Sequence, residues 1–308
     1  MLTFAVYYYT NTRVFLKNKY IFDMLKIDNV SFSYRRKGRL VLEGIDLTVR
    51  PGGVYGLLGS NGVGKSTLLY LIAGALTPRT GEVRFDGVNT RLRQPSTMAE
   101  IFIVPEEIEL PKIKLSSYVK ANSQFYPRFS HEQMLKYLDN FGLETDLHLG
   151  ELSMGQRKKA FISFALACNT SLLLMDEPTN GLDIPGKGAF RRTIASEMND
   201  DRTMIISTHQ VRDIDRLLDH VIIMDHSRVL LDASMGSIMD KLNFVVTSDR
   251  ALIDSALYSQ PSVEGTMVVV PNVTGELTDV NLESLFELAI AKPGYVAELF
   301  NAKNQDEV

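Results

Sequence analysis

The chain has 308 residues, of which 45% are hydrophobic and 23% are charged, and its formal net charge is −4. This is the composition of an ordinary globular protein, and the length allows one large domain or one domain with a small appendage. Without a net positive charge or a long run of Lys and Arg, the chain offers nucleic acid or anionic lipid no general attraction, although a local basic patch is possible at Arg157, Lys158 and Lys159.

The chain has a single cysteine, Cys168, which excludes an intramolecular disulfide and fits a reducing compartment without a metal cluster. Because Cys168 follows the apolar residues 160–167, we expect a buried structural thiol. No run of roughly 18 apolar residues predicts a spanning helix. Residues 4–9 are apolar but short, with no small-residue cleavage site after them, so we do not expect a secretory signal. Any action at a membrane would then require a partner.

The expected elements begin after an N-terminal extension, residues 1–23, which has no clear period and which we expect to be dispensable. Alternation of apolar and polar residues predicts half-buried strands over residues 30–34 and 45–49. Residues 54–58 form a short apolar strand that enters a glycine-rich loop, and residues 66–75 have the pattern of a helix. Residues 82–85 are expected to form one arm of a hairpin that closes at Asp86 and Gly87.

The second half of the chain alternates helical and apolar segments. Residues 115–149 have helical patterning with a break at Gly142. The continuous apolar runs 172–175, 204–206 and 221–224 are typical of buried parallel strands. The tail, roughly residues 243–308, contains two further apolar runs and then a probable helix over residues 281–291. We interpret it as a small α+β appendage.

Residues 59–66 match the pattern of a phosphate-binding loop between a strand and a helix. Glycines let consecutive N–H groups curl around phosphate oxygens, and the helix N-terminus adds partial positive charge. Lys65 would reach the β- and γ-phosphates, and Ser66 would bind Mg²⁺. The alternative, a glycine-rich turn with a chance lysine, rarely has both flanking elements. The predicted ATP-binding residues here are Gly59, Ser60, Asn61, Gly62, Val63, Gly64, Lys65, Ser66 and Thr67.

Two carboxylates, Asp176 and Glu177, follow the apolar run 172–175. A buried strand that ends in acids places them at the edge where α/β sheets bind ligands. Asp176 would hold the Mg²⁺ shell, and Glu177 would orient and polarise the attacking water. On their own, the two acids are also compatible with a solvated strand end before the turn at Pro178.

Four further features resemble the ABC ATPase family, and together with the loop and the acids they appear in the order typical of that family over residues 25–235. Residues 152–156 (Leu-Ser-Met-Gly-Gln) resemble the ABC signature, and residues 180–183 (Asn-Gly-Leu-Asp) look like the D-loop. His209 looks like the switch histidine, and Tyr34 stands at the position that stacks on adenine. Each motif is weak alone, but the ordered set is specific.

The resemblance implies an α/β fold, that of a P-loop NTPase with a mixed central sheet, an antiparallel β subdomain and a helical signature subdomain at about 107–160. The ATPase domain would span residues 24–240, and the small α+β appendage would follow over residues 241–308. In the family the signature contacts the γ-phosphate held by the other subunit. Ser153, Gly155, Gln156 and Asp183 would therefore bind nucleotide across a head-to-tail pair, and His209 would contact the γ-phosphate. Ser153 and Gln156 also fit a capping box, which is compatible with that role.

The sequence departs from the family pattern at two positions. Met154 replaces a glycine of the signature, but the neighbouring Ser and Gly remain. Glu106 stands where the Q-loop glutamine is usual, after the apolar run 103–105. It could bind Mg²⁺, or it could point to solvent beside Glu107.

The family implies an ATP-hydrolysing subunit, a homodimer or a pair with a related ATPase subunit, that closes around ATP and Mg²⁺ and drives a separate transmembrane permease. The single ATPase domain with its tail resembles ABC-2 exporters, which would place the protein in the cytoplasm, peripheral on the inner face of the cell membrane. The alternative is a soluble ABC ATPase acting on the ribosome or DNA, but such proteins usually carry tandem domains, coiled coils or zinc insertions. The sequence does not reveal the cargo.

Overall fold

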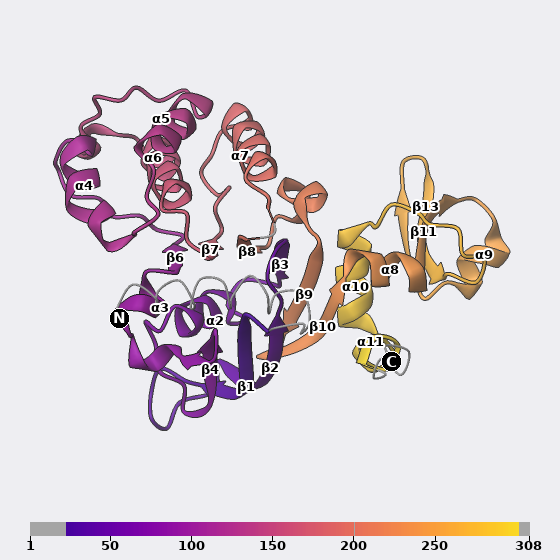
Figure 1. Ribbon diagram of the computed structural model, residues 1–308. Coiled ribbons are helices and arrows are strands. Elements are labelled where there is room, and N and C mark those ends of the chain that lie inside the picture. The colour runs from indigo at the N-terminus through magenta and orange to yellow at the C-terminus, as the bar shows by residue number, and fades with distance from the viewer. Residues whose placement is uncertain (1–22, 200, 302–308) are drawn as a thin grey trace, which may run out of the picture.

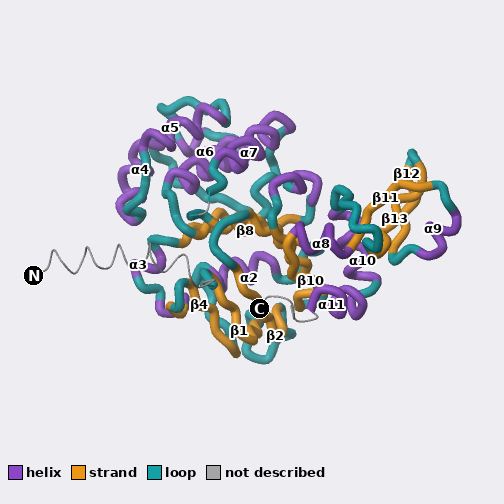
Figure 2. Tube along the Cα trace, turned by 45° about the vertical axis from the view of Figure 1, so that its right-hand side comes forward, coloured by secondary structure: helices purple, strands orange, loops and turns teal. Residues whose placement is uncertain are grey.

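The computed structural model describes residues 23–199 and 201–301 (Figure 1). The predicted N-terminal extension thus lies outside the described residues, apart from Asp23. Three sheets organise the described chain. A central sheet carries helices on one side, an antiparallel sheet lies on its other side, and a small third sheet stands apart near the C-terminus (Figures 1 and 2).

The central sheet has six strands in the order β10-β9-β3-β8-β7-β6. Neighbouring strands run parallel except β10, which is antiparallel to β9. β7 and β8 are buried at every position, and β9 is buried over residues 221–224, which confirms the prediction of buried parallel strands. The strands are β3 (Val54–Leu58), β6 (Ile101–Val104), β7 (Leu172–Asp176), β8 (Thr203–Thr208), β9 (His220–Asp225) and β10 (Arg228–Ser234).

The second sheet is antiparallel, in the order β2-β1-β4-β5, and α2 (Lys65–Ile72) packs between it and the central sheet (Figure 1). The predicted helix 66–75 ends earlier, because Gly74 has a left-handed backbone with φ of 65°. The strand predicted over 30–34 begins earlier, at Leu25, and ends at Phe32, so Tyr34 lies beyond the strand and is exposed. The strands are β1 (Leu25–Phe32), β2 (Leu42–Val49), β4 (Thr80–Phe85) and β5 (Val88–Asn89).

Helices cover the other face of the central sheet and continue into a helical region at one end (Figure 2). They share one apolar core with β6, β7 and β8, and Cys168 is buried in it, as predicted. The expected break at Gly142 is confirmed, because the preceding helix ends at Asn140 and Gly142 has a φ of 67°. The helices are α4 (Leu115–Asn122), α5 (His131–Asn140), α6 (Met154–Ala167) and α7 (Ile184–Ser196), with the short α3 (Pro95–Met98) before β6.

The C-terminal segment is α+β, as predicted, with a three-stranded antiparallel sheet in the order β11-β13-β12. Its last two helices return to the central sheet, where apolar residues of α10 and α11 join the core beside β9 and β10. Within the described ranges, no helix has the length and apolar character needed to cross a membrane. The elements are α8 (Met235–Lys241), β11 (Leu242–Thr247), α9 (Arg250–Ser255), β12 (Tyr258–Ser262), β13 (Gly265–Pro271), α10 (Leu282–Ala291) and α11 (Pro293–Asn301).

Candidate functional site

The glycine-rich loop follows β3 and ends at α2, as the sequence predicts. A Cβ atom on Gly59 would lie 2.7 Å from the carbonyl oxygen of Met224, so only glycine fits there. Gly64, with a φ of 109°, stands at the N-cap of α2 and supplies no side chain to cap the helix. The first N–H groups of α2 therefore have no side-chain acceptor, which leaves donors for an anion.

Lys65, the first residue of α2, is only 6% exposed. Its Nζ donates hydrogen bonds to the carbonyl oxygens of Gly59 at 2.7 Å and Ser60 at 3.1 Å. The same nitrogen lies 3.9 Å from Oε1 of Glu177. Burial lowers the pKa of Lys65, while the carboxylates of Glu177, Asp176 and Glu106 oppose that shift. The loop thus holds an ammonium group beside the carboxylates that follow β7.

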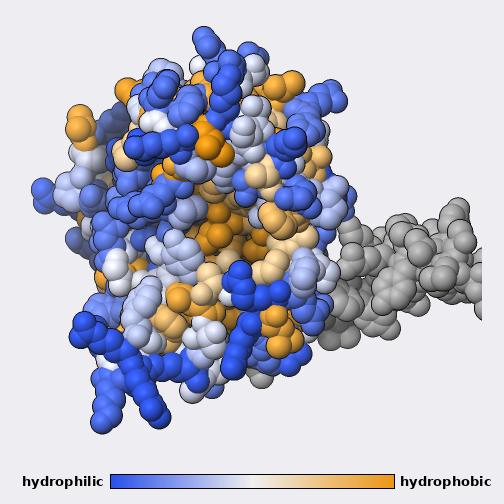
Figure 3. Space-filling view, turned by 90° about the vertical axis from the view of Figure 1, so that its left-hand side faces the viewer, coloured by the Kyte–Doolittle hydropathy of each residue, from blue (hydrophilic) through white to orange (hydrophobic). Residues whose placement is uncertain are grey.

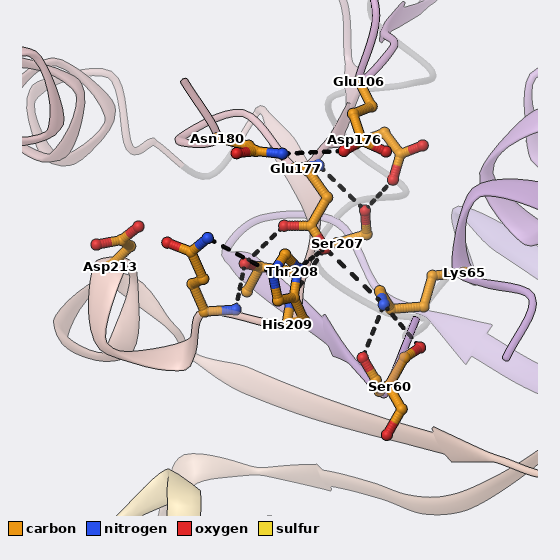
Figure 4. A network of polar contacts seen from close by, with 12 residues as sticks. Ser60, Lys65, Glu106, Asp176, Glu177, Asn180, Ser207, Thr208, His209 and Asp213 are labelled. Atoms are coloured by element: carbon orange, nitrogen blue, oxygen red, sulfur yellow. Dashed lines mark hydrogen bonds and ion pairs between the residues drawn. The ribbon is translucent and has the colours of Figure 1, made fainter. Parts of the chain in front are cut away.

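The two carboxylates lie where β7 and β8 run side by side in parallel, with Asp176 opposite Ser207. The hydroxyl of Ser207 donates to Asp176 Oδ1. Glu177 is 4% exposed and accepts through both of its oxygens (Figure 4). Oε2 accepts from the hydroxyl of Thr208 at 3.1 Å, and Oε1 accepts from the backbone N–H of His209 at 2.9 Å. The acids are buried and held, so they are not a solvated strand end.

His209 contacts Glu177 through its ring as well, with Nδ1 at 2.7 Å from Oε1. The imidazole is partly exposed and lines a cavity of about 210 Å³ beside the loop. The structure therefore brings His209 to the predicted base and to the loop at once. The residues around this cavity are Gly59, Ser60, Asn61, Thr208, His209, Val211 and Phe286.

Tyr34 reaches α2 from the antiparallel sheet. Its hydroxyl lies 2.9 Å from the hydroxyl of Thr67, and its ring meets Phe32 edge to face with centroids 5.0 Å apart. The side chain is 66% exposed. An exposed aromatic face close to the phosphate-binding helix is compatible with stacking on a base.

Glu106 follows β6 and has an exposed carboxylate whose Oε1 accepts from the side-chain amide of Asn180 at 3.0 Å. Figure 4 shows it on the same side of the site as Asp176. The structure therefore places Glu106 next to the acids and against the D-loop residue Asn180, and it does not simply point away beside Glu107.

The signature lies at the start of α6. The predicted capping box is present: Ser153 Oγ accepts from the N–H of Gln156 at 3.3 Å, and Gln156 Oε1 accepts from the N–H of Ser153 at 3.0 Å. Gly155 packs against the carbonyl of Gly181, and Met154 is 67% exposed. In the described part of the chain, no signature residue lines the cavity beside the glycine-rich loop. One chain therefore does not bring these two motifs together.

Asp183 stands at the N-cap of α7, away from the loop. Its Oδ1 accepts from the N–H of Gly186 at 3.2 Å and from Lys159 Nζ at 3.0 Å. The hydrogen bond from Lys159 is the main reason why the pKa of Asp183 is lowered. The basic patch that the sequence leaves possible at Arg157, Lys158 and Lys159 does not form, because Lys159 is paired and Lys158 is buried.

A family model described as ABC transporter matches residues 42–180. The lantibiotic transport ATP-binding protein SrtF of Streptococcus pyogenes is 30% identical over 213 residues, which are 68% of this chain and 90% of that protein. This chain belongs to the family of ABC transporter ATP-binding proteins. The ABC transporter ATP-binding protein NatA of Bacillus subtilis is 29% identical over 241 residues, 73% of this chain and 97% of that protein. The Nod factor export ATP-binding protein I of Cupriavidus metallidurans is 29% identical over 65% of this chain and 68% of that protein.

Solved structures agree on the fold. The ATP-binding subunit of an ABC transporter matches with a TM-score of 0.63 and 24% identity, over 70% of this chain and 91% of that one. The family match and the relatives named above show that the chain is an ATP-binding subunit of an ABC transporter and an ATPase, and members of this family act with a membrane permease component. The predicted P-loop fold is confirmed, and the alternative of a ribosome- or DNA-directed ATPase finds no support among these relatives.

Sequence reasoning missed four residues that contribute to the site of this ABC ATP-binding subunit. Lys158 stands in a run of three basic residues, a pattern that is compatible with a surface patch and does not indicate a contact with the site. Ser207 and Thr208, which donate to Asp176 and Glu177, carry a weak signal as hydroxyl residues at a strand end. Phe286 lies 77 positions after His209 in the sequence, and no local pattern could have joined the two.

Proposed function

We propose that this ABC ATP-binding subunit works as a head-to-tail pair, in which the loop at residues 59–66 of one copy meets the signature of the other across ATP. The observation that carries the proposal is the position of Glu177: a buried carboxylate, held by His209 and Thr208, 3.9 Å from the ammonium of Lys65. The signature lies outside this cavity in the same chain. A second copy, or a related ATPase subunit, would therefore complete the site.

The residues of the loop suit the triphosphate of ATP. The uncapped start of α2 offers N–H donors, and Lys65 offers an ammonium that donates to two loop carbonyls in this structure. Tyr34 would cover the base and Thr67 would hold the Tyr34 hydroxyl. From the other copy, Ser153, Gly155 and Gln156 would bring a second helix N-terminus to the γ-phosphate, and Asp183 would brace that approach.

Ser66 and Asp176 are suited to hold Mg²⁺, which prefers hard oxygen ligands, and Glu106, which Figure 4 shows on the same side of the site as Asp176, would join them. When bound, the ion would neutralise phosphate charge. Glu177 would accept the proton of the attacking water. His209 would keep Glu177 in place through Nδ1 and the backbone N–H, and its exposed ring edge would face the γ-phosphate.

The helical region is suited to bind the permease. Figure 3 shows apolar side chains in a hollow at mid-height on the face that it presents. In the helical region, Leu110, Tyr118 and Phe161 are only partly buried and pack on a buried apolar cluster. They would offer apolar surface to a short permease helix. The buried members of the cluster are Leu115, Leu149, Ala160 and Phe164.

Export is the direction we propose, because two of the relatives named above are lantibiotic transport and Nod factor export proteins. The subunit would then sit on the cytoplasmic face of the cell membrane through its permease, without a span of its own and without binding nucleic acid. Its division would be an ATPase domain over residues 24–240, with a helical subdomain at about 107–160, and a C-terminal segment over 241–308.

Complementation tests the head-to-tail site. Lys65→Ala removes the loop ammonium, and Ser153→Arg blocks the signature. Neither variant alone should hydrolyse ATP, but a mixture should recover hydrolysis, because the mixed pair contains one intact loop opposite one intact signature. A mixture as inactive as its components, with both variants folded and mixed pairs detected by cross-linking, would rule out the proposed arrangement.

A further inference from the structure

Lys158 is a buried cation to which the proposed reaction assigns no role. It lies in the second turn of α6 and is 3% exposed. Its Nζ donates to the carbonyl oxygens of Glu177 at 2.9 Å and Asn180 at 3.0 Å. A buried ammonium is costly unless its hydrogen bonds are satisfied. A methionine would fill the same space without that cost, so the contacts of the ammonium require an explanation.

The turn over residues 177–180, to which Lys158 donates its hydrogen bonds, begins with a residue in a strained backbone conformation. Glu177 has a left-handed backbone with a φ of 44°, which a residue with a side chain seldom adopts. The carbonyl oxygen of Glu177 accepts from Lys158 and also from the N–H of Asn180 at 3.1 Å. Such a conformation persists where surrounding contacts enforce it. Lys158 supplies two of these contacts from outside the turn.

The same contacts reach the loop after β6. Lys158 holds the backbone of Asn180, and the side chain of Asn180 donates to Glu106. Burial lowers the pKa of Lys158, and the carboxylates of Glu106, Glu177 and Asp176 oppose the shift. The ammonium therefore lies within the field of all three acids, behind the turn and away from the cavity that would take the phosphates.

We propose that Lys158 is the positioning residue for Glu177: it fixes the turn 177–180 so that the Glu177 carboxylate points at the attacking water. Lys158 does not line the cavity beside the glycine-rich loop, and its Nζ donates to two backbone carbonyls. The proposal rests on the role of Glu177 as the base in the proposed function. It predicts that Lys158 governs the turnover number, while the affinity for ATP is set elsewhere, by the loop.

A double-mutant cycle tests this assignment, with Lys158→Met, Glu177→Gln and the double variant. Lys158→Met should lower kcat by roughly 10- to 100-fold, since a misplaced catalytic group costs about that much. KM and the binding of a fluorescent ATP analogue should change less than about 2-fold in the same variant. In the Glu177→Gln background, measured by single turnover, Lys158→Met should have no further effect, because there is no base left to position.

Lys136→Met is the matched control. Lys136 also donates a hydrogen bond through its Nζ, to Glu197 Oε1 at 3.1 Å, but it stands on α5, away from the acids. It should keep the kcat of the unchanged protein. If Lys158→Met melts too low to assay, Lys158→Gln, which keeps an N–H donor without the charge, takes its place in the cycle.

The outcomes separate the inference from the proposed function. Full activity in Glu177→Gln would remove Glu177 as the base. A slow Glu177→Gln together with a folded Lys158→Met of normal kcat would remove only the role of Lys158. An equal loss in both backgrounds, or a loss of ATP binding, would show that Lys158 acts on the fold or on the nucleotide, and not through Glu177.

Discussion

Nδ1 of His209 lies 2.7 Å from Oε1 of Glu177, so the residue that follows β8 contacts the residue that follows β7. The N–H of His209 donates to the same oxygen. A carboxylate with both of its oxygens engaged has little freedom to rotate. The geometry therefore favours a base that is in place before water arrives.

Glu177→Gln should slow ATP hydrolysis by at least about 100-fold, because an amide cannot accept a proton from water. Binding of ATP should persist, since the loop and Lys65 are unchanged. The variant should also form a stable pair with ATP, detectable by size-exclusion chromatography with light scattering. Wild-type turnover in this variant would assign the base elsewhere.

Lys65→Ala should weaken the binding of MgATP by roughly 10- to 100-fold, because a charge-assisted contact to the phosphates is lost. Isothermal titration calorimetry measures this directly. Lys26→Ala is a suitable control, since Lys26 is a half-exposed lysine of β1 that pairs with Asp28. Equal affinities in the two variants would contradict the assignment of Lys65.

Glu106→Gln should change the Mg²⁺ concentration that gives half-maximal hydrolysis, because a carboxylate binds this hard ion more strongly than an amide does. The amide can still bond to Asn180, so the loop after β6 should keep its position. A Mg²⁺ titration at saturating ATP gives the midpoint. An unchanged midpoint and rate would mean that Glu106 serves only its contact with Asn180.

Leu288→Ala should lower the free energy of unfolding by about 2–5 kcal/mol, as is usual when a buried leucine is truncated. Leu288 of α10 is 0% exposed and belongs to the core shared with the central sheet. Leu277, which is 64% exposed, provides the control, and Leu277→Ala should cost little. Urea denaturation measures both. Equal small losses would show that α10 contributes little to stability.

Arg212 and Glu283 form a two-pronged ion pair at 2.7 and 2.8 Å between the segment after His209 and α10. Both side chains are largely exposed, so Arg212→Glu should cost less than about 1 kcal/mol of stability. We expect Arg212→Glu to lower the hydrolysis rate instead. The double variant Arg212→Glu with Glu283→Arg should restore that rate. Arg228→Glu, at another exposed pair, should leave the rate unchanged. If the double variant does not restore the rate, the ion pair with α10 does not influence catalysis.

Local patterns in the sequence predicted most of the fold and the neighbourhood of the acids. Buried strands were found because parallel strands covered on both faces are apolar at every position, as in β7 and β8. Helix ends were less accurate: Gly74 stopped α2 early through its backbone, which periodicity does not record. Lys158 was misassigned because a charge run usually lies in solvent, whereas here one of its three members turns inward to two carbonyls.

The return of the C-terminal segment could not be predicted, because it depends on tertiary packing. Composition separates residues 241–308 from the rest, but only the structure shows that α10 lies against β9 and β10. The hydroxyls of Ser207 and Thr208 were missed for the same reason. Their partners, Asp176 and Glu177, lie 31 positions earlier in the sequence, and the register of two parallel strands brings them together.

Phe286 of α10 lines the same cavity as Asn61 and His209. The wall of this cavity is therefore encoded in three separate stretches of the gene, which specify residues 59–61, 208–211 and 286. Chimeras that graft the tail of one ATP-binding subunit onto another would exchange part of this wall together with the graft. A chimera joined at residue 240 would thus have an altered turnover, even if it kept every motif of the recipient. To avoid this, α10 and the β9–β10 hairpin would have to be transplanted together.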